Sequence, residues 1–474
     1  MDNTDKNIIA KLESLPENFW DFSNANTRTH THGLHAYPAM MISPISRNII
    51  GIIGAERKIN SLLDPFSGSG TVLVEGQLAG IPHVVGNDIN PFAVFLSKVK
   101  TTPLDSTEMY AEIARMKSAL ESVYCGMAHI INGIDKEIEL LGYDLTDKDG
   151  WGANAPRILE LYFNRRNISI KIPSFKNIGY WFKPKVIMEL SLIRDVINSV
   201  KSSEIKNFLF LAFSETIRLV SNRRNGEFKM FRMPPDKVKE HNPDTRVEFL
   251  KILDRNSKKI TDFSTGINAQ PRKSTVELYN DDACSLQNID DGVFDLIITS
   301  PPYGDSRTTV AYGEFSRLSL QWLDIFKSDG RDVMRIDKLL MGGKKFKNGF
   351  DFDIPSDNLR MSLDRIRRLD MERAGDVFSF YRDFEKSVHA ISKKTKIGGY
   401  HFWVVGNRTV KNENLQTDII LEQIAEKYGM QKIYSIRRNI SNKVMPSKNS
   451  PTNVIGEKNT TICNEHIVIL KKIA

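Results

Sequence analysis

Two short segments of this 474-residue chain carry residue types that could act together on a substrate. Each follows a short apolar run that predicts a buried strand, and α/β sheets bind their ligands at the carboxyl ends of such strands. We therefore expect the two segments to face one cleft. They are Asp64-Pro65-Phe66-Ser67-Gly68-Ser69-Gly70-Thr71 and Ser300-Pro301-Pro302-Tyr303.

The first segment has the features of a loop that binds an adenosyl group. Gly68 and Gly70 allow a tight turn and a close approach of the backbone to a ligand. Asp88 ends the next predicted strand, where its carboxylate can accept hydrogen bonds from both ribose hydroxyls; an ordinary turn residue is the alternative. The segment lacks the third glycine of a dinucleotide fingerprint and the lysine of a phosphate-binding loop, which favours S-adenosylmethionine over ligands with a pyrophosphate. The residues expected to bind this cofactor are Asp64, Pro65, Phe66, Gly68, Gly70, Thr71 and Asp88.

The second segment could activate the exocyclic amine of a nucleobase. Its two prolines remove backbone donors and leave carbonyl oxygens as acceptors. If the Ser300 hydroxyl and the Pro301 carbonyl both accept hydrogens from the amine, the nitrogen becomes more tetrahedral and its lone pair is freed for a methyl group. Tyr303 would offer a ring on which a flipped base stacks. A proline-stiffened turn without chemistry is the alternative to the expected catalytic set, Ser300, Pro301, Pro302 and Tyr303.

The surrounding patterns predict one α/β sheet interrupted by a helical insertion. Strands are expected near 61–63, 83–86, 275–279, 294–298, 400–405 and 467–471, and helices near 71–79, 379–392 and 418–428. Helical spacing dominates 101–274, notably over 185–200 and 205–220. We expect a Rossmann-like sheet of the S-adenosylmethionine-dependent methyltransferase type, with residues 1–100 and 275–474 forming the catalytic domain and residues 101–274 a mostly helical insertion.

The composition predicts a soluble globular protein with a polyanionic partner. Hydrophobic residues make up 41% of the chain, charged residues 26%, and the formal net charge is +8. No apolar run approaches the roughly 18 to 20 residues that span a bilayer, and the first residues are polar, so we expect a cytoplasmic protein. The three cysteines include no CxxC pair, so no metal site is expected.

At the two segments the chain resembles the DNA amino-methyltransferases, the N4-cytosine and N6-adenine enzymes of restriction-modification systems. The resemblance covers the Asp-Pro-Phe-x-Gly-Ser-Gly-Thr loop, Asp88 and the Ser-Pro-Pro-Tyr loop. It implies that Asp282 contacts the cofactor adenine and that segment 31–39, with Tyr37 and Pro38, closes over the methionine end. Because Ser-Pro-Pro-Tyr is commoner among the cytosine enzymes, N4 of cytosine is favoured over N6 of adenine. Double-stranded DNA and a cognate restriction endonuclease are the partners that the resemblance implies.

The order of the motifs resembles the arrangement in which the insertion reads the target sequence. Within it, segment 218–229 combines arginines, amides and an aromatic ring, a mix that suits phosphate and base-edge contacts; a solvated basic loop is the alternative. A basic C-terminal stretch could contact the DNA backbone, and it includes Lys443 and residues 448–451. The residues expected to bind DNA are Arg218, Asn222, Arg223, Arg224, Lys229, Arg437 and Arg438.

Three other functions compete with this interpretation. A C5-cytosine methyltransferase usually presents its nucleophilic cysteine after a proline, and none of the three cysteines follows one. An RNA guanine-N2 methyltransferase can share both loops, but those enzymes usually carry an RNA-binding domain first, and only about 60 residues precede Asp64. A catalytically silent nucleic-acid-binding module is disfavoured by the two intact loops.

Overall fold

A seven-stranded sheet in the order β3-β2-β1-β4-β5-β11-β8 holds both loops. The computed structural model describes residues 1–224, 226, 228–305, 308–324, 333–344, 353–440, 448–449, 459–460 and 464–474. Strands β3, β2, β1, β4 and β5 run parallel, whereas β11 is antiparallel to both β5 and β8. The strands of this sheet are β1 Ser61–Asp64, β2 His83–Asn87, β3 Thr275–Tyr279, β4 Phe294–Thr299, β5 Thr395–Gly406, β8 Met430–Asn439 and β11 Asn464–Lys472.

Two short pairings, of three and two residues, and one single-residue bridge complete the described β-structure. They are β6 Arg408–Val410 with β7 Glu413–Leu415, β9 Lys448–Asn449 with β10 Asn459–Thr460, and an isolated bridge between Arg223 and Arg232.

All six strands predicted from the sequence are present, and the α/β fold class is confirmed. β5 is longer than its predicted range because the backbone pairs with β4 and β11 beyond the apolar stretch. The edge strand β8 was not predicted. Its buried positions do not alternate cleanly, and its pairing with β11 is irregular at Ile469 and Leu470, so the period of two that marks a strand is broken.

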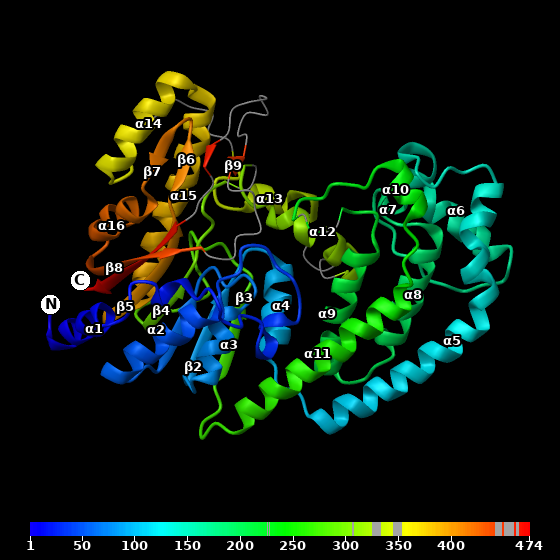
Figure 1. Cartoon of the computed structure of the whole chain (residues 1–474), viewed down its shortest axis with the longest axis horizontal. Coiled ribbons are helices and arrows are strands. Elements are labelled where there is room, and N and C mark those ends of the chain that lie inside the picture. The colour runs from blue at the N-terminus through cyan, green and yellow to red at the C-terminus, as the bar shows by residue number, and fades with distance from the viewer. Residues whose placement is uncertain are drawn as a thin grey trace.

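Helices cover both faces of the sheet, since successive strand residues point to opposite sides. In β1, Leu62 packs in a cluster with helices α1 to α3, whereas Leu63 packs in a cluster with α15 and α16. Figure 1 shows both chain termini in this sheet body. Its helices are α1 Asn3–Glu13, α2 Ser43–Glu56, α3 Thr71–Leu78, α4 Pro91–Thr101, α13 Ile336–Leu339, α14 Asp357–Leu369, α15 Met371–Lys394 and α16 Thr417–Lys427.

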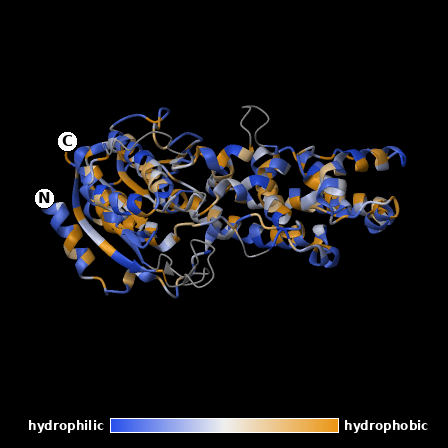
Figure 2. Ribbon diagram, turned by 90° about the horizontal axis from the view of Figure 1, so that it is seen from above, coloured by the Kyte–Doolittle hydropathy of each residue, from blue (hydrophilic) through white to orange (hydrophobic). Residues whose placement is uncertain are grey.

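A second body is helical and extends from the sheet body along the long axis of the molecule (Figure 2). Among the described residues, none between 101 and 274 joins the seven-stranded sheet. The helices of this body are α5 Ser106–Leu140, α6 Ala153–Asn164, α7 Ile178–Trp181, α8 Pro184–Asn198, α9 Ser203–Val220, α10 Pro235–Glu240, α11 Thr245–Asn268 and α12 Tyr312–Leu323.

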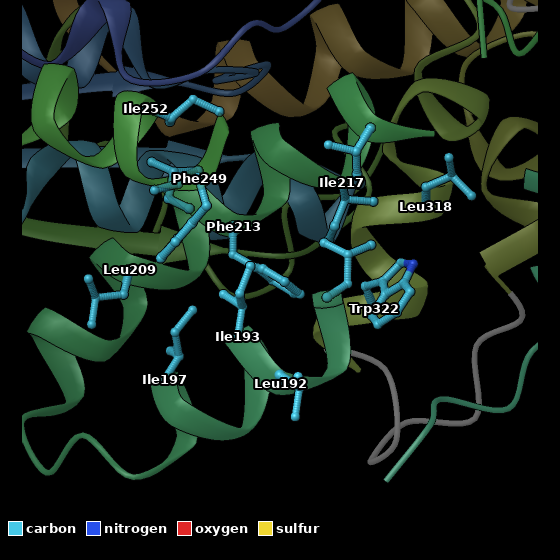
Figure 3. Packing of buried hydrophobic residues seen from close by; sticks show 14 of the residues in the cluster. Leu192, Ile193, Ile197, Leu209, Phe213, Ile217, Phe249, Ile252, Leu318 and Trp322 are labelled. Carbon is cyan, nitrogen blue, oxygen red and sulfur yellow. The ribbon is translucent and has the colours of Figure 1, made fainter. Parts of the chain in front are cut away.

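Helix α12 follows β4 in the chain but packs into the helical body. Figure 3 shows Leu318 and Trp322 of α12 beside Ile217 and Phe213 of α9, and the rings of Trp322 and Phe213 lie 6.1 Å apart. Because its buried apolar face fills this core, α12 ties the helical body to the catalytic loop that precedes it. No helix in the described part of the chain combines the length and hydropathy needed to cross a membrane.

Strands β1 and β4 are direct neighbours, and this pairing brings the two predicted segments together. Leu62 pairs with Leu296 and Leu63 with Ile297 in a parallel register. Both loops therefore leave the sheet at the same edge, although more than two hundred residues separate them in the sequence.

Candidate active site

One cavity of about 230 Å³ opens at the carboxyl ends of β1, β2 and β4. Both predicted loops contribute to its wall, as does the N-terminal segment that precedes α2. The predicted residues that line it are Tyr37, Pro38, Asp64, Pro65, Phe66, Gly68, Thr71, Asp88, Asp282, Ser300 and Pro302. Gly70, Pro301 and Tyr303 were also predicted for the site, and they are adjacent in the chain to lining residues but are not part of the lining themselves.

The Asp88 carboxylate is fixed by backbone donors on both of its oxygens. Gly68 N donates to Oδ2 at 2.9 Å and Asn90 N donates to Oδ1 at 2.8 Å. Burial raises the pKa of Asp88 to about 6, although the two backbone hydrogen bonds oppose this shift. The carboxylate is thus oriented toward the cavity with lone pairs left for a ligand.

The two glycines of the loop have backbone angles that other residues rarely adopt. Gly68 has φ of +48° and Gly70 has φ of +72°. A Cβ at Gly70 would also lie 2.8 Å from the Ser97 hydroxyl oxygen, closer than packed atoms approach. The turn between β1 and α3 therefore depends on glycine at Gly70 for both backbone angle and space.

A buried lysine, which the sequence reasoning missed, also holds the loop between β1 and α3. The Lys100 ammonium donates to the carbonyl oxygen of Ser69 at 2.5 Å. Burial lowers the pKa of Lys100 to about 7, against a smaller effect of the nearby Glu75 carboxylate. A lysine on the apolar side of a predicted helix, next to Val99, was the signal that could have identified it.

The N-terminal segment closes one side of the cavity through Tyr37. Asn90 Nδ2 donates to the Tyr37 hydroxyl at 3.1 Å and to the Ser316 hydroxyl of α12 at 2.8 Å. The Tyr37 ring lies 5.8 Å from the ring of Tyr312, another wall residue that was not predicted. One asparagine thus joins the cofactor loop, the N-terminal segment and α12.

The two loops touch directly through Asp64. Thr299 Oγ1, at the end of β4, donates to Asp64 Oδ1 at 2.7 Å, and Phe66 N donates to the same oxygen at 3.2 Å. Burial raises the pKa of Asp64 to about 7. Because Thr299 immediately precedes Ser300, this contact sets the distance between the two loops.

The Ser300 hydroxyl is positioned as an acceptor. It donates its proton to the carbonyl oxygen of Val404 in β5 at 3.1 Å and lies 3.4 Å from the Tyr303 hydroxyl. Its lone pairs remain for a donor in the cavity, because the Tyr303 hydroxyl itself donates to Glu465 Oε1 at 2.8 Å.

A buried ion pair holds Tyr303 from behind. Glu465 of β11 pairs with the guanidinium of Arg438 in β8, and Arg438 Nε donates to the carbonyl oxygen of Trp20 at 2.8 Å. The prediction that Arg438 contacts DNA is therefore wrong, because its side chain is only 5% exposed and is engaged in this network. The adjacent Arg437 is exposed.

A second ion-pair cluster holds the residues that follow Tyr303. The Asp305 carboxylate is fully buried, 3.3 Å from Arg373 Nη1 and 3.5 Å from Arg408 Nη1. The Arg408 guanidinium also packs against Gly304, where a Cβ would lie 1.7 Å from Nη1. The catalytic loop is thus fastened on two sides by arginine–carboxylate pairs, none of which the sequence reasoning identified.

Three residues of the predicted DNA-binding segment lie in the protein interior, which corrects that prediction. Arg218 is 5% exposed, donates to the carbonyl oxygen of Phe315 at 2.7 Å and lies over the Phe315 ring. Asn222 and Arg223 are 1% and 4% exposed and donate to backbone carbonyls nearby. Long polar side chains in a basic motif can direct donors to acceptors on the protein itself, and each of these three donates at least one hydrogen bond to a backbone carbonyl.

The remaining DNA-binding predictions stay open. Arg224 is exposed and Lys229 is half-buried, in the loop that joins α9 to α10. Lys443 and residues 450–451 lie outside the described residues, and of residues 448–449 only the backbone of β9 is described.

A parallel sheet whose first and fourth strands end in loops around one cavity, with an acidic side chain fixed at the end of β2, defines an S-adenosylmethionine-dependent methyltransferase. No protein-family model matches the chain. It is 37% identical over 482 aligned positions to "Type II methyltransferase M.MvaI" of Kocuria varians, covering 99% of this chain and 98% of that one. The chain therefore belongs to the type II DNA methyltransferases, and its methyl donor is S-adenosylmethionine.

Two further similarities are more distant. "Type II methyltransferase M.MjaII" of Methanocaldococcus jannaschii is 24% identical over 243 positions, 45% of each chain. The solved structure of the rRNA methyltransferase aviRa from Streptomyces viridochromogenes aligns over 92% of this chain and 88% of its own, with 8% identity. Its TM-score of 0.28 is too low to support a shared fold.

Proposed function

We propose that this protein is a site-specific methyltransferase of double-stranded DNA that methylates the exocyclic amine of a flipped base, N4 of cytosine in preference to N6 of adenine. The observation that carries the proposal is that Ser300 of the second loop lines the same cavity as Asp88, which follows β2 and is hydrogen-bonded to Gly68 of the first loop. Its relative named as a type II methyltransferase favours the role of modification enzyme in a restriction-modification system, together with a cognate endonuclease.

The residues of the cavity fit S-adenosylmethionine. The fixed carboxylate of Asp88 suits two ribose hydroxyls, and the absence of a Cβ at Gly68 leaves room beside the Tyr37 ring. The wall has acidic side chains, among them Asp88 and Asp282, and also basic ones, so it offers groups of both signs to a zwitterionic ligand. When bound, this cofactor supplies an electrophilic methyl group on its sulfonium.

The chain itself prepares the amine. Ser300 Oγ, with its proton given to Val404, accepts one hydrogen of the amine, and the Pro301 carbonyl is assigned the other. Two acceptors draw electron density toward the nitrogen and hold it in line with the methyl group, so catalysis comes from orientation and electrostatics without a covalent intermediate. Serine as the first residue of the loop is the basis for preferring cytosine.

Target recognition is assigned to residues 101–274, whose helices form the second body. Helix α12, which follows the catalytic loop in the chain, packs against α9 of this body. A DNA duplex lying across both bodies would present a flipped base to the cavity.

The test is expression in a host without DNA methylation, followed by digestion of the host DNA to nucleosides, mass spectrometry and methylation-sensitive sequencing. We expect N4-methylcytosine in one sequence context, and less of it with the Ser300→Ala variant at the same expression level. N6-methyladenine would overturn the choice of base. Unmethylated DNA together with methylated RNA would overturn the proposal.

A further inference from the structure

Two phenylalanine side chains project from the loop between α9 and α10. Phe228 is 42% exposed and Phe231 is 49% exposed. The two residues are three positions apart in one loop, and exposed apolar side chains gathered on one part of a surface can mark a binding site. We define these two side chains as the aromatic pair.

The base of this loop is held rigidly on the helical body. Arg223 and Arg232 form a β-bridge, and Met233 N donates to the Asn222 carbonyl at 2.8 Å. The Arg232 guanidinium donates to the Tyr180 carbonyl at 2.8 Å and lies 4.3 Å from the centre of the Tyr180 ring. Arg223, which is buried, and Arg232, which is half-buried, therefore hold the two ends of the loop on the helical body, which lowers the cost of ordering its base when a partner binds.

The loop lies beside the active-site cavity. Met230 N donates to Glu314 Oε2 of α12 at 3.2 Å, and the Phe228 ring lies 6.1 Å from the Phe315 ring. Phe315 is in turn 5.7 Å from the ring of Tyr37, which lines the cavity. A continuous row of aromatic contacts thus links the aromatic pair to the cavity wall.

We propose that Phe228 and Phe231 form a wedge that enters the DNA base stack next to the target and fills the space left by the flipped base. This inference rests on the proposed function. A base that leaves the duplex opens a gap with apolar walls, and apolar side chains inserted between base steps stabilise such distorted duplexes. Arg224 and Lys229 belong to the same loop and add positive charge beside the phosphates.

A wedge makes a specific kinetic prediction. It helps only when the target base must be unpaired and unstacked, which costs a few kcal/mol for a paired base and less for a mismatched one. Removing it should slow methylation of a fully paired duplex by about 10- to 100-fold, because each factor of ten in rate corresponds to about 1.4 kcal/mol. The same change should have little effect when the target base is already mismatched.

The experiment compares single-turnover methylation with tritiated S-adenosylmethionine in the wild type and in the Phe228→Ala/Phe231→Ala double variant. The probes are two synthetic duplexes that contain the sequence mapped in the expression host, one fully paired and one with the target base opposite an abasic site. A Phe228→Leu/Phe231→Leu variant keeps apolar volume and should recover most of the rate. Ile397→Ala is the matched control, since Ile397 is 75% exposed at the amino-terminal end of β5, the opposite edge of the sheet.

Rescue of the alanine variant on the abasic duplex, with Ile397→Ala unchanged on both probes, is the expected result. Equal loss on both duplexes would overturn the wedge and indicate a general binding or folding role. Wild-type rates for the alanine variant on the paired duplex would also overturn the wedge, and would indicate that the aromatic pair binds a protein partner instead. In both cases methylation by the wild type would leave the proposed function standing, whereas its failure on both duplexes would contradict that function itself.

Discussion

The Asp88 carboxylate provides the sharpest test of the cofactor site, because a substitution can remove its negative charge while keeping the shape of its side chain. In the structure both oxygens accept backbone N–H groups, at 2.9 and 2.8 Å. Asp88→Asn keeps the shape but places an NH₂ group opposite one of these donors, so one backbone N–H or one amide N–H loses its partner. Asp88→Ala removes the ligand contacts altogether.

The magnitude follows from the two ribose contacts assigned to this side chain. Hydrogen bonds to a charged group contribute about 1.5 to 3 kcal/mol each, so their loss should weaken cofactor binding by about 100-fold or more. The asparagine variant should be nearly as weak as the alanine variant, because an unpaired buried donor costs about 1 to 3 kcal/mol.

The pH dependence has a defined sign. Burial raises the pKa of the Asp88 carboxyl to about 6 in the ligand-free protein, and a ligand that needs the ionised form binds more weakly as the pH falls through that value. Affinity for S-adenosylhomocysteine should therefore fall between pH 7.5 and pH 5, with proton release on binding near pH 6. Asp64, whose pKa burial raises to about 7, touches the same cavity, so Asp64→Asn is the control that isolates Asp88.

Isothermal calorimetry in two buffers of different ionisation enthalpy measures both the affinity and the protons released. An affinity that stays flat from pH 5 to pH 7.5 in the wild type would refute the assignment of Asp88 as the ribose acid. So would an Asp88→Asn variant with wild-type affinity.

Three further predictions concern the loops. Ser300→Ala should lower kcat about 10- to 100-fold with little change in the calorimetric affinity for cofactor, because one acceptor for the amine is lost. Gly304→Ala should lower the single-turnover rate by at least about 10-fold, because the new Cβ overlaps the Arg408 guanidinium; an unchanged rate would show that this loop tolerates movement. Burial lowers the pKa of Lys100 to about 7 from its ordinary 10.5, so the unfolded chain binds more protons than the folded chain between these two pH values. The free energy of unfolding of the wild type should therefore rise with pH across this range. Urea melts of Lys100→Met, which also loses the contact to Ser69, should show a smaller rise.

Sequence patterns were sufficient for the elements whose side chains repeat regularly. Leu62-Leu63 and the apolar stretch from Phe294 to Ile298 marked β1 and β4, and the loop motifs marked where these strands end. The sequence predicted that the two segments face one cleft; the pairing of β1 with β4 and the Thr299 to Asp64 contact come from the structure.

Contacts between distant parts of the chain were beyond sequence reasoning. Nothing local to Glu465 or Arg438 indicates that they pair behind Tyr303, because their partners come from three different strands and loops. The same holds for Arg408 and Asp305, which are 103 residues apart. A single sequence shows the residue types but not which of them the fold brings together.

The positions of the arginines explain why positive charge was a poor guide to the DNA-binding surface. A buried guanidinium is costly unless every donor finds an acceptor, and Arg218, Arg408 and Arg438 each find carbonyls or carboxylates on neighbouring segments. Arg408 and Arg438 support the residues at the end of the catalytic loop, and Arg218 supports helix α12, which packs beside the cavity. The rigid charged interior thus positions Ser300 and the aromatic pair, which are the groups assigned to touch the base and the base stack. In such an arrangement, specificity depends on how firmly the loops are held in place more than on the number of cations at the surface. The variant Arg438→Met should therefore impair methylation while leaving the salt dependence of DNA binding unchanged.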